Sequence, residues 1–284
     1  MRQPTVPLLL VDGHHLLYRS YFGFPARITS RDQSRDLTGL FGFLAMLRKA
    51  HREYAADHQL VVVFDGEYGR SERTAVDPSY KANRVDADQT AIESLPAVKD
   101  GLAYAQVPWV EVETAEGDDV IATLTRIALE HDRAVTVMSG DRDYYQLLEP
   151  GRVRVLNTAM PDRFVDLAAV HRRFGVYPAQ WVDYRSLTGD PSDNVPGVPG
   201  IGPKTAARLL SGGVSLEAAS TPAMLTERLN PWLRTRLIAQ WEDVLRWREL
   251  LRMNSKVDLT APGEAGATPT LPPPARIVEH LGLW

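Results

Sequence analysis

Leu60-Val61-Val62-Val63-Phe64-Asp65 is a continuous apolar run that ends in an aspartate. The same arrangement occurs in Leu8-Leu9-Leu10-Val11-Asp12, and Ala134-Val135-Thr136-Val137-Met138 is followed after two residues by Asp141. Continuous rather than alternating hydrophobicity predicts strands that are buried on both faces, as in a parallel α/β sheet. Parallel sheets place ligand sites beyond the carboxyl ends of their strands, so we expect the three carboxylates to converge on one edge.

Helical stretches separate these runs. Residues 37–54 carry apolar residues at helical spacing, with Thr38 as the expected N-cap, and residues 119–130 repeat the pattern. Two further short strands are expected around residues 108–112 and 152–156. The fold class is therefore α/β, with a mainly parallel central sheet flanked by helices.

The chain divides by character near residue 176. Residues 66–105 form a long, charged segment between strands, which predicts a functional insertion in the first part, residues 1–176. Residues 177–284 change to short helices and glycine turns, which predicts a smaller helical subdomain and a tail. Within that tail, Pro262 to Pro274 reads as a linker or strap before a short C-terminal helix.

The composition limits the chemistry. A length of 284 residues with 44% hydrophobic content is enough for a sizeable core. No apolar run approaches the roughly 18 residues that span a bilayer, and the apolar start is too short for a signal peptide, so we expect a cytoplasmic protein. With no cysteine in the chain, a metal ion would have oxygen or imidazole ligands.

The formal net charge of −4 argues at first against a nucleic-acid partner. The distribution of charge weakens that argument. If nine of the acidic residues hold metal ions, the remainder of the chain carries +5. A basic surface facing DNA therefore remains compatible with the composition.

Nine carboxylates occur in short clusters at expected turns and helix starts. Like charges this close repel one another unless cations neutralise them, and Mg²⁺ or Mn²⁺ prefers such oxygen ligands. Alternatively, the acids near residue 116 favour a helix N-terminus and the others are solvated turns. The set is Asp12, Asp65, Glu116, Asp118, Asp119, Asp141, Asp143, Asp190 and Asp193.

A glycine-rich turn at Gly197-Val198-Pro199-Gly200-Ile201-Gly202-Pro203-Lys204-Thr205-Ala206 has the form of a helix-hairpin-helix. Its glycines let the backbone approach a phosphate, and Lys204 adds a positive charge. This arrangement holds a duplex backbone without reading bases. The alternative is an ordinary glycine-rich turn.

Seven segments together resemble the 5′ nuclease (flap endonuclease) superfamily, most closely the 5′-3′ exonuclease domain of bacterial DNA polymerase I. They cover the chain from residue 8 to about 210 in the family's order. The segments are 11–13 with 17–21, 38–43, 62–65, 80–84, 116–121, 139–143 and 189–197, the last leading into the hairpin.

The resemblance implies a helical arch at about 66–105 and a helix-hairpin-helix (helix-three-turn-helix) subdomain. It implies that Asp12, Asp65, Glu116 and Asp118 or Asp119 lie near a first metal ion, and Asp141, Asp143, Asp190 and Asp193 at or near a second. Lys81 and Arg73 resemble the basic pair at the scissile phosphate. The resemblance also implies that the hairpin binds a potassium ion through backbone oxygens. The residues expected to contact DNA are Arg19, Arg84, Gly197, Gly200, Gly202, Lys204 and Thr205.

Three features depart from the family's pattern. Glu72 stands where the family has an aromatic residue before the arginine, so spacing alone places Arg73. His14-His15 replaces small residues, which favours local packing or a DNA-facing variation over a histidine metal ligand. The arch segment Val85-Asp86-Ala87-Asp88 is more acidic than the family's, which bears on how tightly it holds a 5′ single strand.

The implied activity is that of a stand-alone 5′-3′ exonuclease and flap endonuclease. It would use two or more Mg²⁺ or Mn²⁺ ions to cut 5′ flaps, nicked or gapped duplexes and RNA primer–DNA in replication and repair. A monomer at the nucleoid, working with a DNA polymerase or sliding clamp, is expected. Two alternatives stay open: a metal-dependent ribonuclease of similar sheet architecture, and a catalytically silent DNA-junction binder.

Overall fold

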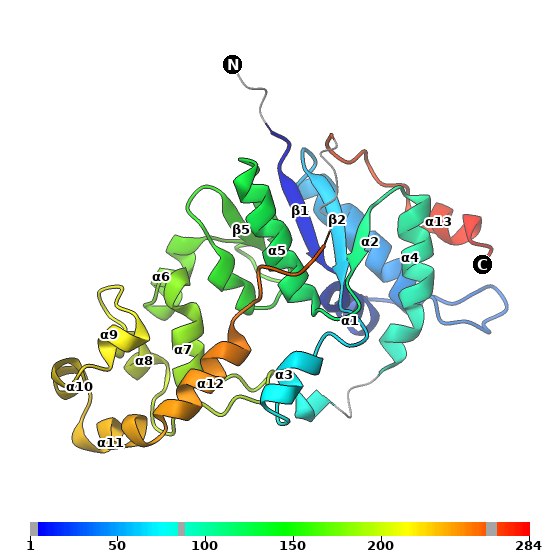
Figure 1. Cartoon of the computed structure of the whole chain (residues 1–284). Helices are drawn as coiled ribbons and strands as arrows, with labels where there is room; N and C mark the ends of the chain where they lie inside the picture. The colour runs from blue at the N-terminus through cyan, green and yellow to red at the C-terminus, as the bar shows by residue number, and fades with distance from the viewer. Residues whose placement is uncertain (1–4, 85–88, 260–265) are drawn as a thin grey trace.

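The computed structural model describes residues 5–84, 89–259 and 266–284. The acidic segment Val85-Asp86-Ala87-Asp88 and the start of the Pro262–Pro274 strap lie outside the described residues. One six-stranded sheet organises the chain (Figure 1). Its strands are β1 (Leu8–Asp12), β2 (Gln59–Phe64), β3 (Trp109–Glu111), β4 (Val135–Met138), β5 (Val153–Leu156) and β6 (Phe164–Val165).

The sheet has the order β3-β2-β1-β4-β5-β6, and all its pairings are parallel except the antiparallel pairing of β5 with β6. The expected mainly parallel sheet is confirmed, including the two short strands near residues 108–112 and 152–156. The sequence did not predict β6, since two residues are too few to show a period. The three strongest apolar runs became the central strands β2, β1 and β4, which are buried throughout except for Asp12.

Helices cover both faces of the sheet. On one face, α5 (Gly117–Glu130) packs Val120 and Ile121 in the same core cluster as Leu10. On the other face, Leu9 belongs to a second cluster with α2 (Thr38–Tyr54) and α4 (Leu95–Tyr104). Alternate residues of β1 thus serve opposite layers, which explains why the run had to be apolar throughout.

The start of α2 corrects one sequence expectation. Leu37, not Thr38, occupies the N-cap and makes no side-chain cap bond. Thr38 is the first helical residue, and its Oγ1 instead accepts a hydrogen bond from the amide of Ile28 at 2.9 Å. Asp36 accepts from the Thr38 amide at 2.9 Å, so a carboxylate two residues earlier does the capping work. Thr38 was misassigned because a distant loop takes its hydroxyl.

The segment after β2 contains several short helices. Its start lies beside the carboxyl ends of the strands, whereas α4 belongs to the helical layer of the core (Figure 1). The helices before α4 are α3 (Ser71–Val76), η1 (Ala82–Arg84) and η2 (Gln89–Ser94).

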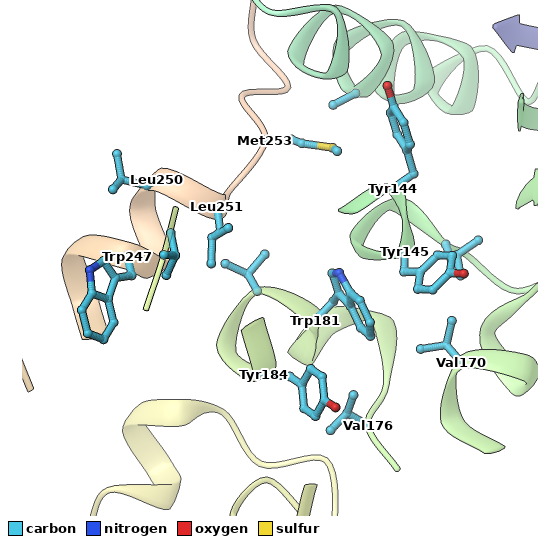
Figure 2. Close-up of a cluster of buried hydrophobic side chains, with 14 of the residues drawn as sticks. Tyr144, Tyr145, Val170, Val176, Trp181, Tyr184, Trp247, Leu250, Leu251 and Met253 are labelled. Atoms are coloured by element: carbon cyan, nitrogen blue, oxygen red, sulfur yellow. The ribbon is translucent and has the colours of Figure 1, made fainter. Parts of the chain in front are cut away.

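The helical subdomain is joined to the sheet by one apolar cluster. Figure 2 shows Tyr145 beside Trp181, with their ring centroids 5.0 Å apart, and residues of α12 approaching from the other side. The buried Trp247 and Leu251 of α12 belong to the same core. Two elements on the sheet side of this region precede residue 176: η3 (Asp143–Leu147) and α6 (Leu167–Phe174). The helical subdomain itself contains η4 (Pro178–Gln180), α7 (Trp181–Thr188), α8 (Pro203–Leu209), α9 (Leu216–Ala219), α10 (Pro222–Arg228), α11 (Pro231–Ala239) and α12 (Trp241–Leu251).

The C-terminal residues return to the sheet. Thr268 donates its amide to the carbonyl of His58 at 3.0 Å, and α13 (Pro274–His280) packs Ile277 and Val278 into the core layer of α2 and α4. The other helix of this layer is α1 (Gly13–Gly23). Among residues 5–84, 89–259 and 266–284, no helix is long and apolar enough to cross a membrane.

Candidate active site

The carboxylates that follow the central strands meet at one edge of the sheet. Asp12 ends β1, Asp65 follows β2, and Asp141 follows β4 after two residues. A cavity of about 910 Å³ opens there. Its lining includes these three aspartates together with Glu116, Asp118 and Lys81.

Glu116, Asp118 and Asp119, here called the first triplet, open helix α5. One ligand atom from each lies within 4.8 Å of the others. The helix start favours acidic side chains, because the helix dipole is positive there. Two cations come from the segment after β2: Lys81 donates its Nζ to Glu116 Oε1 at 2.5 Å, and Arg73 donates to both Glu116 and Asp119.

Burial and these cations act in opposite directions on the first triplet. Burial alone would raise the pKa of Glu116, but Lys81 and Arg73 lower it below its usual value. Burial raises the pKa of Asp118 well above its usual value, and the same two cations offset only part of that rise. Asp118 Oδ1 has no hydrogen-bond partner among the described residues, its ion-pair contact being Arg73 Nη1 at 3.8 Å.

Asp119 faces a different space from Asp118. It borders a separate cavity of about 620 Å³, and its Oδ1 accepts from Arg73 Nη2 and from the amide of Asn254, both at 2.7 Å. Thr123, one turn later, accepts from the amide of Val257 at 3.1 Å. Asp119 therefore helps to attach residues 254–257 to α5, and Asp118 is the aspartate that shares a cavity with Asp12 and Asp65.

Asp143, Asp190 and Asp193, here called the second triplet, also have ligand atoms within 4.8 Å of one another. Asp143 begins η3, and the two others lie in the turn after α7, which a bridge between Asp190 and Val195 closes. Arg185 of α7 pairs with Asp190 and approaches Asp143 Oδ1 to 3.8 Å.

The second triplet is unevenly neutralised. Burial, followed by the neighbouring charges of Asp141, Asp190 and Asp193, raises the pKa of Asp143 well above its usual value. Burial would also raise the pKa of Asp190, but Arg185 and the Ser192 hydroxyl lower it overall. One member of the triplet is thus stabilised as an anion, and another is not.

Lys81 links the two triplets. Its Nζ lies 3.7 Å from Asp193 Oδ1 as well as contacting Glu116, and its amide donates to the Asp193 carbonyl at 3.1 Å. Asn83 donates to the Pro191 carbonyl at 2.7 Å, and Asn194 donates to the Ser79 carbonyl at 2.8 Å. Residues 79–83 and the turn at 190–195 are therefore fixed to each other.

The donor set fits hard divalent cations. Both triplets consist of carboxylate oxygens, which Mg²⁺ and Mn²⁺ prefer. Burial raises the pKa of Asp12, and the charges of Asp65 and Asp141 raise it further against the opposing effect of His15. A cation would relieve this repulsion, and it would give Asp118 Oδ1 a partner.

His14 and His15 each use one ring nitrogen on a backbone amide. His14 Nδ1 accepts from the amide of Asp65, and His15 Nε2 accepts from the amide of Gly140, both at 3.0 Å. These bonds fasten the first turn of α1 to the loops after β2 and β4. The geometry supports the packing interpretation, since those two nitrogens are already engaged.

The glycine hairpin lies between α7 and α8. Gly197 and Gly200 have φ values of 69° and 91°, which other residues rarely adopt. A side chain added at Gly202 would meet open space, and Lys204 and the half-buried Thr205 follow in α8. This loop thus exposes Gly200 and Gly202 to solvent, with the exposed Lys204 beside them.

Arg19 and Arg84 are the two other residues expected to contact DNA. Arg19 is half-buried and donates to the Thr158 hydroxyl, and burial together with the charge of Arg163 lowers its pKa. The side chain of Arg84 lies outside the described residues.

Sequence reasoning missed two polar side chains of the site. Arg185 stands five residues before Asp190 on a helix, with no spacing to mark it as the partner of a carboxylate. Tyr144 is buried, and its hydroxyl donates to Asp12 Oδ2 at 3.1 Å. A tyrosine directly after Asp143 was the only available signal, and buried aromatic residues more often belong to the core.

Two family models match nearly the whole chain. The first, described as 5′-3′ exonuclease, N-terminal resolvase-like domain, matches residues 7–175, and the second, 5′-3′ exonuclease, C-terminal SAM fold, matches residues 176–269. The thermostable DNA polymerase I of Thermus thermophilus is 35% identical over 280 residues, which cover 98% of this chain and 32% of the polymerase. DNA polymerase I of Deinococcus radiodurans is 39% identical over 219 residues, or 75% of this chain and 22% of that protein. The chain thus spans about a third or less of these relatives.

Solved structures share the fold. The T5 D15 protein co-crystallised with metal ions superposes with a TM-score of 0.67 at 20% identity, covering 88% of this chain and 90% of that one. The catalytic core of Rad2 in complex with a DNA substrate gives a TM-score of 0.61 at 16% identity, covering 99% and 89%. At these identities the likeness establishes the arrangement of elements.

Proposed function

The chain belongs to the 5′-3′ exonuclease family, and from that membership we propose a structure-specific 5′ nuclease. It hydrolyses DNA phosphodiesters where single-stranded and double-stranded DNA meet, as a 5′-3′ exonuclease and flap endonuclease. One observation carries the proposal: two carboxylate triplets, linked by Lys81, lie at the carboxyl edge of the sheet in a chain that also exposes a glycine hairpin.

We propose Mg²⁺ or Mn²⁺ as the cofactor. Asp12, Asp65, Glu116 and Asp118 would hold one ion, and Asp141, Asp143, Asp190 and Asp193 would hold or border another. When bound, such ions activate water and stabilise the leaving oxygen of a phosphodiester. Asp119 is the member whose contacts support a positioning role, because it binds Arg73 and the amide of Asn254.

Lys81 and Arg73 are the proposed catalytic cations. Both are paired with carboxylates here, and those are the charges that metal ions would neutralise. Released from part of this pairing, each can bind the scissile phosphate, where a fixed cation helps most as charge develops in the transition state. The pairing of Arg73 with the first triplet supports its assignment despite Glu72 before it.

The hairpin is the proposed grip on the duplex. Gly197, Gly200, Gly202, Lys204 and Thr205 would contact the phosphate backbone, and backbone oxygens of the turn would hold a potassium ion. Arg19 and Arg84 would contact DNA nearer the cut. The open space at Gly202 and the exposure of Lys204 support this part. Such contacts recognise shape rather than base sequence.

We further infer a catalytic part at 1–176, with the arch at about 66–105, and a DNA-binding part with a tail at 177–284. The two family models meet at residues 175 and 176, which supports this division. The role is removal of flaps and primers and repair, on 5′ flaps, nicked or gapped duplexes and RNA primer–DNA. A cytoplasmic monomer at the nucleoid, working with a DNA polymerase or sliding clamp, completes the proposal.

The test is cleavage of a labelled 5′-flap DNA with Mg²⁺, read at nucleotide resolution beside a single-stranded RNA of matching sequence. We expect cuts near the junction that leave a 5′-phosphate and a 3′-hydroxyl, no cleavage with EDTA, and little cleavage of the RNA. Loss of cleavage in Asp118→Asn and Asp143→Asn would connect the activity to both triplets. Preferred RNA cleavage would point to the ribonuclease alternative, and binding without cleavage to a silent junction binder.

A further inference from the structure

The exposed surface around the hairpin is larger than the glycine turn itself. Here it is called the hairpin face, and it comprises the loop at residues 197–202, helix α8 (Pro203–Leu209) and residues 231–236 of helix α11 (Pro231–Ala239). These parts lie in the helical subdomain, away from the C-terminal helix α13 (Figure 1). Twenty-one residues, 210–230, separate α8 from α11 in the sequence, so their proximity is a result of folding.

Helix α11 packs directly on the glycine turn. A Cβ atom built at Gly200 would lie 2.7 Å from the Trp232 ring and 3.0 Å from the Leu233 side chain. Gly200 is therefore glycine for two reasons, its φ of 91° and the ring that covers it. Trp232 has a fixed place beside the backbone that faces DNA in the proposed function.

Trp232 remains 55% exposed although it is a large apolar side chain. Arg236, one turn later on α11, lies over its ring with the Cζ atom 4.1 Å from the ring centroid. In this position the guanidinium covers one part of the indole and still faces outward. A rigid aromatic ring with a cation on top can bind a deoxyribose face and a phosphate at the same time.

The charge of the hairpin face favours an anionic partner. The loop, α8 and α11 carry Lys204, Arg208, Arg234 and Arg236 and no Asp or Glu, within a chain whose formal net charge is −4. In the part of the chain that the structure describes, no carboxylate forms an ion pair with Lys204 or Arg236. Unpaired cations beside a backbone-exposing turn complement phosphates.

We propose that Trp232 and Arg236 extend the hairpin's grip along the duplex. Arg236 binds one backbone phosphate beyond those held by the turn, and Trp232 packs against the neighbouring sugar. The inference rests on the proposed function, and it assigns to α11 a contact that is independent of base sequence. These residues act on duplex affinity and leave the metal-binding carboxylates unchanged.

The experiment measures duplex and flap affinity of the full chain over a range of salt concentrations. The variants are Arg236→Gln, Arg236→Lys and Trp232→Ala, with Lys49→Ala and Ile238→Ala as matched controls. Lys49 is an exposed cation of α2, and Ile238 is a 59% exposed apolar residue of the same helix α11. Thermal unfolding of every variant shows whether the fold is retained.

We expect Arg236→Gln to weaken duplex binding roughly fivefold at low salt and to reduce the slope of log K against log salt by about 0.9, the value for one phosphate. Arg236→Lys should restore the slope, and the turnover number on saturating flap should match the parent. Trp232→Ala should also weaken duplex binding. It should reduce the slope of log K against log salt by no more than Arg236→Gln does, because it removes no charge. Neither control should change affinity by more than about twofold.

An Arg236→Gln variant that binds duplex as tightly as the parent, with an unchanged salt slope, would overturn the proposal and would point to a protein partner for this face. Equal losses in Arg236→Gln and Lys49→Ala would overturn it as well, because the effect would then be one of net charge. Should Trp232→Ala unfold, Trp232→Phe and the Arg236 variants still decide the question. If the parent cuts flaps and all variants bind DNA normally, this inference alone fails. If the parent does not cut flaps, the proposed function fails.

Discussion

The two carboxylate triplets differ in the origin of their counter-charges. The first triplet receives Arg73 and Lys81 from the segment after β2, a part of the chain outside the sheet core. The second triplet receives Arg185 from α7, the helix whose Trp181 is buried in the cluster of Figure 2. In the proposed function, Arg73 and Lys81 exchange carboxylate partners for the substrate phosphate. Arg185 lies on a helix packed into the core, and we expect it to stabilise the fold.

The largest expected effect tests the exchangeable cations. Lys81→Ala should lower the single-turnover rate on saturating flap by about 100- to 1,000-fold, because Lys81 reaches both triplets and would sit at the phosphate in the transition state. Arg73→Ala should lower it less, since Arg73 contacts the first triplet alone. Lys49→Ala on α2 is the control for loss of one positive charge. An unchanged rate with a raised half-saturation would refute the role of Lys81.

The next prediction separates two aspartates of the second triplet by thermal unfolding without metal. Asp190→Asn should lower Tm by several degrees, because the half-buried Arg185 loses the charge of its buried partner. Asp143→Asn should raise Tm by about 2–4 °C, because it removes a buried charge that Asp141, Asp190 and Asp193 repel. Mg²⁺ should then stabilise the parent more than either variant. A lower Tm for Asp143→Asn would contradict the unequal neutralisation.

The pH dependence of the metal-free protein sharpens the same contrast. The pKa of Asp143 in the folded protein is raised above its ordinary value of 3.8, so the native state keeps a proton that the unfolded state releases. Stability from this group therefore falls as pH rises from about 4 toward the raised pKa. The Tm advantage of Asp143→Asn should be near zero at pH 4 and grow toward pH 7, by about 2–4 °C.

The contribution of Asp190 to stability changes with pH in the opposite direction. Its lowered pKa gives stability that is present above 3.8 and is lost as pH falls through the lower value. The Tm deficit of Asp190→Asn should therefore persist across pH 4 to 7. If the Tm differences of the two variants from the parent changed with pH in the same way, the second triplet would titrate as one uniform group. That result would contradict the unequal neutralisation of Asp143 and Asp190.

The sheet and the convergence of carboxylates were accessible from sequence because both depend on local pattern. Continuous apolar runs specify strands buried on two faces, and an aspartate after each run must lie at the carboxyl edge of a parallel sheet. The strand β6 and the capping at Asp36 were not accessible. The first has two residues, and the second depends on a loop at Ile28 that takes the Thr38 hydroxyl.

Adjacent residues with separate roles were also beyond sequence reasoning. Asp118 and Asp119 point roughly 100° apart on α5, so one faces the strand ends while the other faces the returning chain at Asn254. Nothing local shows which of the two faces the metal side. The approach of Asp190 to Asp143 likewise depends on tertiary packing of α7, through Trp181 and Tyr145.

The smallest expected effect concerns Tyr80, whose hydroxyl donates to Glu116 Oε2 at 3.0 Å. Glu116 also accepts from Lys81 and Arg73, so Tyr80→Phe leaves the carboxylate paired and should cost only about 1 kcal/mol, or about 2 °C in Tm. Tyr68→Phe is the matched control, because Tyr68 is 51% exposed. With Mg²⁺ present the cost should shrink, since a cation takes over part of the neutralisation of Glu116. A loss several times larger, unchanged by Mg²⁺, would mean that Tyr80 holds Glu116 in place and that the two cations contribute little, which would erase the difference between the triplets.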